Sequence, residues 1–163
     1  MELKTDLFKK ICGNYVTGVT VITSKIDEKD YGFTANSFTS VSLDPMLILF
    51  CIQKDAKSNE ALIEKNRFVI SILSENQEEI CYRFSDPKLN QIERFENVET
   101  FKSKNSIKII SGSIAWIECL VTNKIEAGDH FIFLGEVIDG KIRSNDQPLV
   151  YHKSRIKKLL NIF

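Results

Sequence analysis

Two long apolar segments separated by a short turn constrain the fold of this chain most strongly. Residues 114–125 and 131–142 both have strand-like character, and the turn EAGDH at 126–130 between them contains a glycine. This arrangement predicts a β-hairpin. Both segments are apolar on two faces except near Glu118 and Glu136. This is expected for a closed or sandwiched sheet rather than for a sheet with one face exposed to solvent. We therefore predict a fold dominated by antiparallel strands.

Shorter segments of strand character fill much of the remaining chain. They are residues 18–24, 31–37, 46–52, 67–73, 107–110 and 148–151. Helices are predicted over residues 7–12, 59–65 and 74–84, and residues 88–106 are expected to form short helical turns and a mobile surface loop. Six or seven antiparallel strands with a few inserted helices predict a small β-barrel with helical crossovers. A length of 163 residues predicts one domain, residues 1–163.

Composition argues against several classes of protein. Lysine plus arginine and aspartate plus glutamate balance at 22 each, which argues against a nucleic-acid binder dominated by phosphate contacts. The longest apolar run, residues 46–52, is too short to span a bilayer, and the charged N-terminus lacks a signal-type apolar core. We therefore expect a cytoplasmic protein. Four widely spaced cysteines without a CxxC pair predict free thiols and no metal site.

Residues 31–45, YGFTANSFTSVSLDP, are the most informative for function. In this segment many hydroxyl and amide side chains lie between apolar residues, and the segment ends at Asp44-Pro45. Buried hydroxyls need hydrogen-bond partners, so the composition suits backbone held near a flat polar ligand. An edge strand running into a serine- and threonine-rich turn is the alternative interpretation.

Together with segments elsewhere, this stretch is similar to a known family. The order GVTVITS, GFTANSFTSVSLDP, KSN, FVISIL, RFS, WIEC, GDH and PLVYH resembles the flavin reductase-like family of FMN-binding split barrels, from about Phe8 to about Arg155. The resemblance implies a mainly β split barrel with Greek-key-like antiparallel strands and a homodimer. It also implies an NAD(P)H:flavin oxidoreductase that transfers a hydride from NADH or NADPH to FMN, or to FAD, and can supply a partner monooxygenase.

The resemblance also implies which residues bind the flavin. The expected flavin contacts come from the hydroxyl-rich segment, the start of the second helix and the end of the third: Thr34, Asn36, Ser37, Ser40, Val41, Ser42, Gln53, Lys57, Ser58, Asn59, Phe84 and Ser85. Lys57, Ser58 and Asn59 open a predicted helix, whose N-terminal N–H groups and positive dipole end favour a phosphate. The alternative for these three residues is a plain helix cap beside a solvated lysine.

The resemblance also places the nicotinamide near His130, and we expect Tyr151 and Arg155 to line the same opening of the binding site. Hydride transfer needs no protein acid or base in its first step, so we expect His130 to orient the nicotinamide rather than to transfer a proton. The alternative is a turn histidine paired with Asp129. No GxGxxG motif occurs, which argues against a Rossmann-type nucleotide site.

Two rival functions stay open at this point. The chain could hold FMN tightly and relay electrons between proteins, as flavoredoxin-like members of the family do, or it could be a non-enzymatic flavin-binding module. Trp116 and Glu118 share one side of a predicted strand, where a core or interface role is favoured over a catalytic one.

Overall fold

The fold is built on one large antiparallel sheet. The computed structural model describes residues 4–159 and, within them, arranges the strands in three sheets. The strands of the large sheet, in spatial order, are β3 (Lys29–Ala35), β2 (Thr20–Ile26), β6 (Arg67–Ile72), β9 (Ala115–Ala127), β10 (His130–Ile142), β5 (Met46–Gln53) and β4 (Thr39–Leu43). Every neighbouring pair is antiparallel. The prediction of a mainly antiparallel β fold is confirmed.

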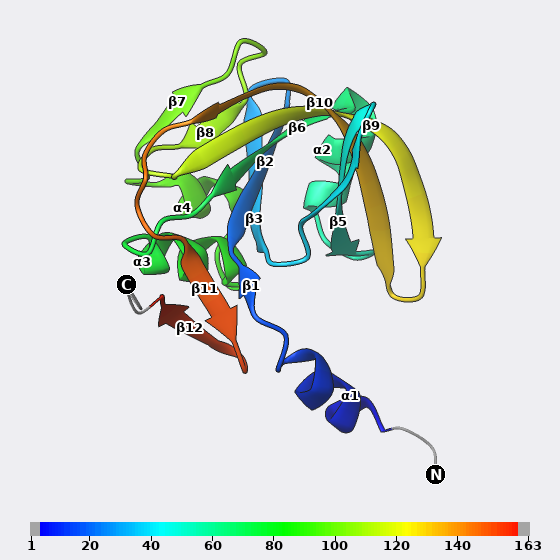
Figure 1. Ribbon diagram of the computed structural model, residues 1–163. Coiled ribbons are helices and arrows are strands. Elements are labelled where there is room, and N and C mark those ends of the chain that lie inside the picture. Colours follow the sequence, from blue (N-terminus) through cyan, green and yellow to red (C-terminus); the bar gives the residue numbers. More distant parts are fainter. Residues whose placement is uncertain (1–3, 160–163) are drawn as a thin grey trace.

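The large sheet curls into a barrel that stays split on one side (Figure 1). Strand β3 at one end of the sheet comes close to β5 near the other, and the rings of Phe33 and Phe50 lie 6.0 Å apart between centroids. The sheet order contains no β3–β5 ladder, so the barrel is not closed by strand pairing. This opening is where the candidate site lies.

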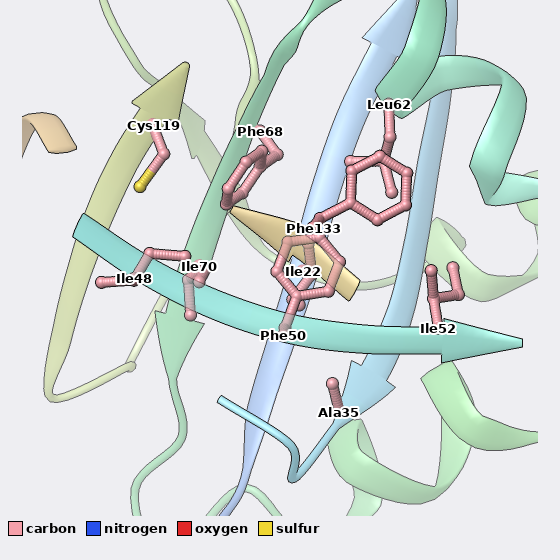
Figure 2. Packing of buried hydrophobic residues seen from close by; sticks show 10 residues of the cluster. All are labelled: Ile22, Ala35, Ile48, Phe50, Ile52, Leu62, Phe68, Ile70, Cys119 and Phe133. Atoms are coloured by element: carbon pink, nitrogen blue, oxygen red, sulfur yellow. The ribbon is translucent and has the colours of Figure 1, made fainter. Parts of the chain in front are cut away.

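An aromatic cluster fills the barrel (Figure 2). Phe50 stacks on Phe133 at 5.5 Å between ring centroids and meets Phe68 edge-on at 5.0 Å. All three rings are fully buried. Burying a phenylalanine side chain contributes about 1.5–3 kcal/mol, so these strands are held rigidly behind the opening.

Four helices and two small sheets surround the barrel in the part of the chain that the structure describes. The helices are α1 (Thr5–Cys12), α2 (Ser58–Lys65), α3 (Glu78–Ser85) and α4 (Gln91–Phe95). The small sheets are β1 (Thr17–Gly18), β11 (Leu149–His152) and β12 (Arg155–Lys158), and the pair β7 (Thr100–Lys102) and β8 (Lys108–Ile110). Helix α1 projects away from the barrel (Figure 1), and none of its residues is buried. None of the helices described has the length and apolar character that a membrane crossing requires.

Residues 88–106 contain the predicted short helical turn, but part of the predicted loop is strand. The segment holds α4 and β7, and a capping box begins α4, in which Asn90 accepts from Glu93 N–H while the Glu93 carboxylate accepts from Asn90 N–H. Phe95 is then buried edge-on against Phe84, with ring centroids 5.0 Å apart. Asn90 and Glu93 have the spacing of a capping box, which is readable in the sequence.

The β9–β10 hairpin also differs from its prediction. Residues 122–127 of β9 are exposed, because β9 pairs with β6 only as far as Leu120 and continues beyond it paired with β10 alone. Its turn is tighter than expected, because Gly128 adopts φ +61° and the strands close around Gly128 and Asp129 alone. The tight turn brings His130, the first residue of β10, opposite Gln53 at the end of β5.

Candidate functional site

A cleft of about 530 Å³ opens where β3 and β5 end at the split side of the barrel. Its apolar lining residues include Phe33, Ile52 and Phe84. Polar side chains line the cleft as well. Nine residues predicted to bind flavin or nicotinamide line the cleft: Thr34, Asn36, Ser37, Gln53, Lys57, Ser58, Phe84, Ser85 and His130.

Ser37 ties the connection between β3 and β4 to β5. Its hydroxyl accepts a hydrogen bond from the Cys51 N–H at 2.9 Å and lies 3.1 Å from the Cys51 carbonyl oxygen, to which it donates. One side chain therefore satisfies both backbone groups of a β5 residue beyond the end of the β4–β5 ladder. This contact fixes the Asn36–Ser37 backbone at the edge of the cleft, so the predicted role of the Ser37 hydroxyl in ligand contact competes with a structural one.

Lys57 and Ser58 mark the start of α2 at one end of the cleft. Lys57 is exposed and precedes the helix, whose first-turn N–H groups lack intrahelical partners. The predicted serine cap is wrong, because the helix begins at Ser58 and no side-chain cap bond is formed at its N-terminus. Asn59 does not line the cleft. Its amide donates to the carbonyls of Gln53 and Lys54 at 2.8 and 3.0 Å, which holds the loop between β5 and α2.

A wall of α3 and α4 closes the other side of the cleft. The Thr34 hydroxyl donates to the Cys81 carbonyl at 2.7 Å, which ties β3 to α3. Gly32 permits this approach, because a Cβ there would lie 2.6 Å from the Phe84 ring. Helix α4 is tied to the same glycine, since Gln91 accepts from Gly32 N–H and Arg94 donates to the Gly32 carbonyl, both at 2.8 Å.

Gln91 and Arg94 line the cleft and were missed in the sequence, where they lie in the supposed loop. Arg94 also donates to the Asp86 carbonyl at 2.9 Å. Burial lowers the pKa of the Arg94 guanidinium, although the charge of Asp86 opposes this effect. The cation therefore serves mainly to join α3, α4 and β3, and its presence in the wall was not predictable without the tertiary contacts.

His130 stands at the mouth of the cleft on the hairpin turn. Its Nδ1 lies 2.7 Å from the Asp129 carboxylate, and this hydrogen bond, together with the histidine charge, holds the pKa of Asp129 below its usual range. The Asp129 carbonyl accepts from Lys54 N–H at 3.0 Å, which fixes the turn against β5. Both interpretations of His130 therefore hold geometrically, since it is paired with Asp129 and also lines the cleft.

Five predicted site residues in addition to Asn59 lie elsewhere. Ser40, Val41 and Ser42 occupy the edge strand β4, where a bulge interrupts the pairing with β5. Tyr151 lines a separate cavity of about 850 Å³ beside α1, which meets the cleft at Asn36 and Ser37. Arg155 is exposed on β12, outside the linings of both cavities as residues 4–159 define them. The roles assigned to these five residues stay predictions.

The arrangement suits a flat heteroaromatic ring with an anionic tail. Apolar side chains offer one surface for the ring, while Asn36 and Gln53 offer hydrogen-bonding groups at its edge and Lys57 offers a cation at one end. Among the described residues no group of three histidine, cysteine, aspartate or glutamate side chains is placed to hold a metal ion. The cleft therefore fits binding and orientation of an organic redox ligand.

Comparison with known proteins is consistent with such a ligand. The family model described as the flavin reductase like domain matches residues 12–160. The chain is 44% identical over 126 residues to a probable flavin reductase of Rhizobium meliloti, but it spans only 40% of that protein's length. It is 35% identical over 136 residues to the reductase subunit of a flavin-dependent monooxygenase of Mycobacterium tuberculosis, and it covers 71% of that protein and 83% of its own length. An NADH-dependent FAD reductase of Streptomyces globisporus is 40% identical over 132 residues, with 80% of this chain and 72% of the relative covered.

Solved structures are similar over almost the whole chain. An NADH:FAD oxidoreductase of Streptomyces globisporus, solved with NAD and FAD fragments, superposes with a TM-score of 0.91 at 33% identity and covers 99% of both chains. A flavin reductase solved with NADP+ superposes with a TM-score of 0.86 at 31% identity, over 96% of this chain and 98% of that one. The split-barrel fold is thus shared with proteins that bind both kinds of ligand.

Proposed function

The chain belongs to the flavin reductase-like family, and we propose that it is an NAD(P)H-dependent flavin reductase. Family membership rests on the match over residues 12–160. The observation that carries the proposal is the cleft at the ends of β3 and β5, which combines apolar side chains, polar side chains and the cation of Lys57. A single domain spanning residues 1–163 stays part of this proposal, as does the classification as an NAD(P)H:flavin oxidoreductase.

In this proposal the cleft holds the isoalloxazine ring of FMN or FAD. The backbone around Asn36 and Ser37, fixed by the Ser37–Cys51 hydrogen bonds, presents donors and acceptors to the polar edge of the ring. Gln53 adds an amide from the end of β5, and Lys57 with the start of α2 holds the first phosphate. The bound flavin supplies an electrophilic N5 that accepts two electrons as a hydride.

The protein's task is then to position the donor. With both ligands bound, the flavin would accept at N5 the hydride that the reduced nicotinamide gives up from C4, and the nicotinamide would be oxidised as the flavin is reduced. His130, at the mouth and steadied by Asp129, would orient the nicotinamide and needs to move no proton. Tyr151 and Arg155 are further predicted contacts at the same side.

We also propose a homodimer that delivers reduced flavin to a partner monooxygenase. Helix α1 exposes Leu7, Phe8 and Ile11, and the edge strand β4 together with the first residue of β5 exposes Val41, Leu43 and Met46. Apolar side chains gathered on a projecting helix and an unpaired strand edge are features of a subunit interface. Molecular mass by light scattering would test this, since a monomer across the micromolar range would contradict it. The partner is suggested by the relatives named as monooxygenase reductase subunits.

A cytoplasmic location belongs to the same proposal. All four cysteines of the chain lie within the described residues and are free thiols, as expected in a reducing compartment.

Anaerobic mixing tests the proposed function. Protein, flavin and NADH or NADPH are combined without oxygen, and the oxidised-flavin absorbance near about 450 nm is followed. We expect rapid bleaching that depends on the protein. Retention of flavin through gel filtration would favour an electron carrier with tightly bound FMN, and loss of flavin would favour a reductase of free flavin. No bleaching with either donor would leave only a non-enzymatic flavin-binding module.

A further inference from the structure

A small cavity of about 370 Å³ lies where the end of α1 meets the turn between β11 and β12. We call it the lysine pocket, and its lining residues are Lys9, Lys10, Gly13, Asn14, Lys153 and Ser154. The two parts of the chain are joined directly, because the Lys153 N–H donates to the Gly13 carbonyl at 2.8 Å. Three cations from opposite ends of the sequence are therefore held around one hollow.

The backbone fixes the positions from which these lysines project. Lys153 and Ser154 adopt φ of 49° and 60°, and β11 and β12 pair on either side of them. Two successive left-handed residues are typical of a tight hairpin turn. On α1 the Asn14 side chain donates to the Lys10 carbonyl at 2.8 Å, which closes the last turn of the helix. The lysine side chains are exposed, but their backbone positions are defined.

Neighbouring carboxylates do not balance the charge of the lysine pocket. Residues 4–14 and 149–159 contain seven lysines and arginines but a single acidic residue, Asp6. Among the side chains that the structure describes, no ion pair uses Asp6 or a lysine of the pocket. The chain as a whole has 22 basic and 22 acidic residues, so its charges are segregated. The end of the molecule formed by α1, β11 and β12 is positive (Figure 1).

Helix α1 carries its lysines and its apolar side chains on different sides. With about 3.6 residues per turn, Leu7, Phe8 and Ile11 fall on one face. Lys9 and Lys10 fall on the other side of the helix. The subunit interface proposed above uses the apolar face, which leaves the two lysines available to a further partner.

The lysine pocket also adjoins the proposed flavin site through a neighbouring cavity. It shares Lys9, Gly13 and Ser154 with the cavity of about 850 Å³ beside α1. That cavity meets the flavin cleft at Asn36 and Ser37. A protein bound at the lysine pocket would therefore lie beside a continuous series of cavities that leads to the flavin.

We propose that the lysine pocket docks a partner protein through a cluster of its aspartate or glutamate carboxylates. Because that partner would be the protein that receives reduced flavin, the inference rests on the proposed function. Every side chain of the pocket is exposed, so one small anion would be held weakly, whereas several carboxylates presented together add their attractions. The 22 acidic residues elsewhere on the chain disfavour a nucleic acid or an anionic membrane, which would be repelled beyond the pocket.

The test neutralises the lysine pocket and measures binding of an acidic peptide. The pocket variant combines Lys9→Gln, Lys10→Gln and Lys153→Asn, and asparagine suits the left-handed backbone at position 153. The probe is an unlabelled deca-glutamate peptide, and isothermal titration calorimetry gives its dissociation constant. Circular dichroism checks the fold, because lysines in the last turn of α1 also favour the helix dipole. Lys153→Asn alone leaves α1 unchanged and should weaken the peptide by about twofold.

A matched control removes the same number of charges elsewhere. It combines Lys29→Gln, Lys102→Gln and Lys141→Gln, which change exposed lysines outside the pocket. We expect the control to match wild type within about twofold and the pocket variant to bind about tenfold more weakly, since each exposed ion pair contributes roughly twofold. Binding to wild type should weaken as salt rises from about 20 to about 200 mM.

Two kinds of result would overturn the proposal. One is equal affinity of the pocket variant and the control, or no binding of the peptide to wild type at low salt. The other is tighter binding of oligothymidylate or of phosphatidylserine vesicles than of the peptide, lost in the pocket variant, because the partner would then be a nucleic acid or a membrane.

Failure of the proposed function is distinguishable from failure of this inference. Bleaching of FMN by NADH or NADPH is measured on the same three proteins, and equal rates are expected because none of the changed residues lines the flavin cleft. If none of them bleached flavin while the peptide bound as expected, the reductase function would fall and the acidic docking site would stand. Full bleaching without discrimination between the variants by the peptide would overturn the docking site alone.

Discussion

Replacing Ser37 by alanine should both destabilise the fold and loosen the flavin cleft. The Ser37 hydroxyl, in the connection between β3 and β4, partners the N–H and the carbonyl of Cys51 on β5, at 2.9 and 3.1 Å. Alanine leaves both groups without this partner, and an unsatisfied buried backbone group costs about 1–3 kcal/mol. Cys51 is only half-buried, so water can compensate in part. We expect the free energy of unfolding to fall by about 2 kcal/mol.

Ser40→Ala is the matched control for this substitution. Ser40 lies in the same segment with an exposed side chain on β4, so its loss should change stability by less than about 0.5 kcal/mol. Urea unfolding followed by circular dichroism gives both values, and fluorescence titration gives the flavin affinity. Ser37→Ala should also weaken flavin several-fold through the freed Asn36 backbone. Two variants equal in stability would refute the role of Ser37 as the link between the β3–β4 connection and β5.

Three further predictions follow from the cleft and the core. Lys57→Glu should weaken FMN more than riboflavin, because only FMN carries the phosphate; equal losses in titration would remove Lys57 from the phosphate site. His130→Ala should raise KM for the nicotinamide donor and leave flavin affinity near normal, and the reverse pattern would move His130 into the flavin contacts. Burial, with smaller contributions from Glu78 and Glu118, raises the pKa of Cys81 to about 11 and that of Cys119 to about 12 from an ordinary 9.0. These two thiols therefore ionise at lower pH in the unfolded chain than in the folded protein. The free energy of unfolding measured in urea should fall as pH rises from about 9 to 12. Cys119→Ala should make this fall less steep, and an unchanged slope would contradict the prediction.

The strands of the barrel were predictable because their patterns are local. Residues 46–52 form an unbroken apolar run and became β5, and residues 67–73 became β6 with a difference of one residue at its end. Strand β12 was not predicted, because its basic sequence carries no alternation and its pairing with β11 decides it. Exposure of residues 122–127 could not be foreseen either, since an apolar pattern does not say where the pairing of β9 with β6 ends.

The candidate site was predictable where the family resemblance points to short segments of the chain. The predicted residues that line the cleft are Thr34, Asn36, Ser37, Gln53, Lys57, Ser58, Phe84, Ser85 and His130. Gln91 contacts Gly32 across 59 positions of the chain, so no local pattern could reveal it. Ser40 and Ser42 fall on an exposed edge strand because a bulge changes the register after Ser40, and a register change of this kind is set by the pairing with β5 rather than by composition.

The location of the flavin tests the central claim most directly. A crystal structure of the protein with oxidised FMN should show the ring in the cleft between the ends of β3 and β5, and the phosphate within hydrogen-bonding distance of Lys57. FMN bound in the larger cavity beside α1, or with its phosphate remote from Lys57, would contradict the account.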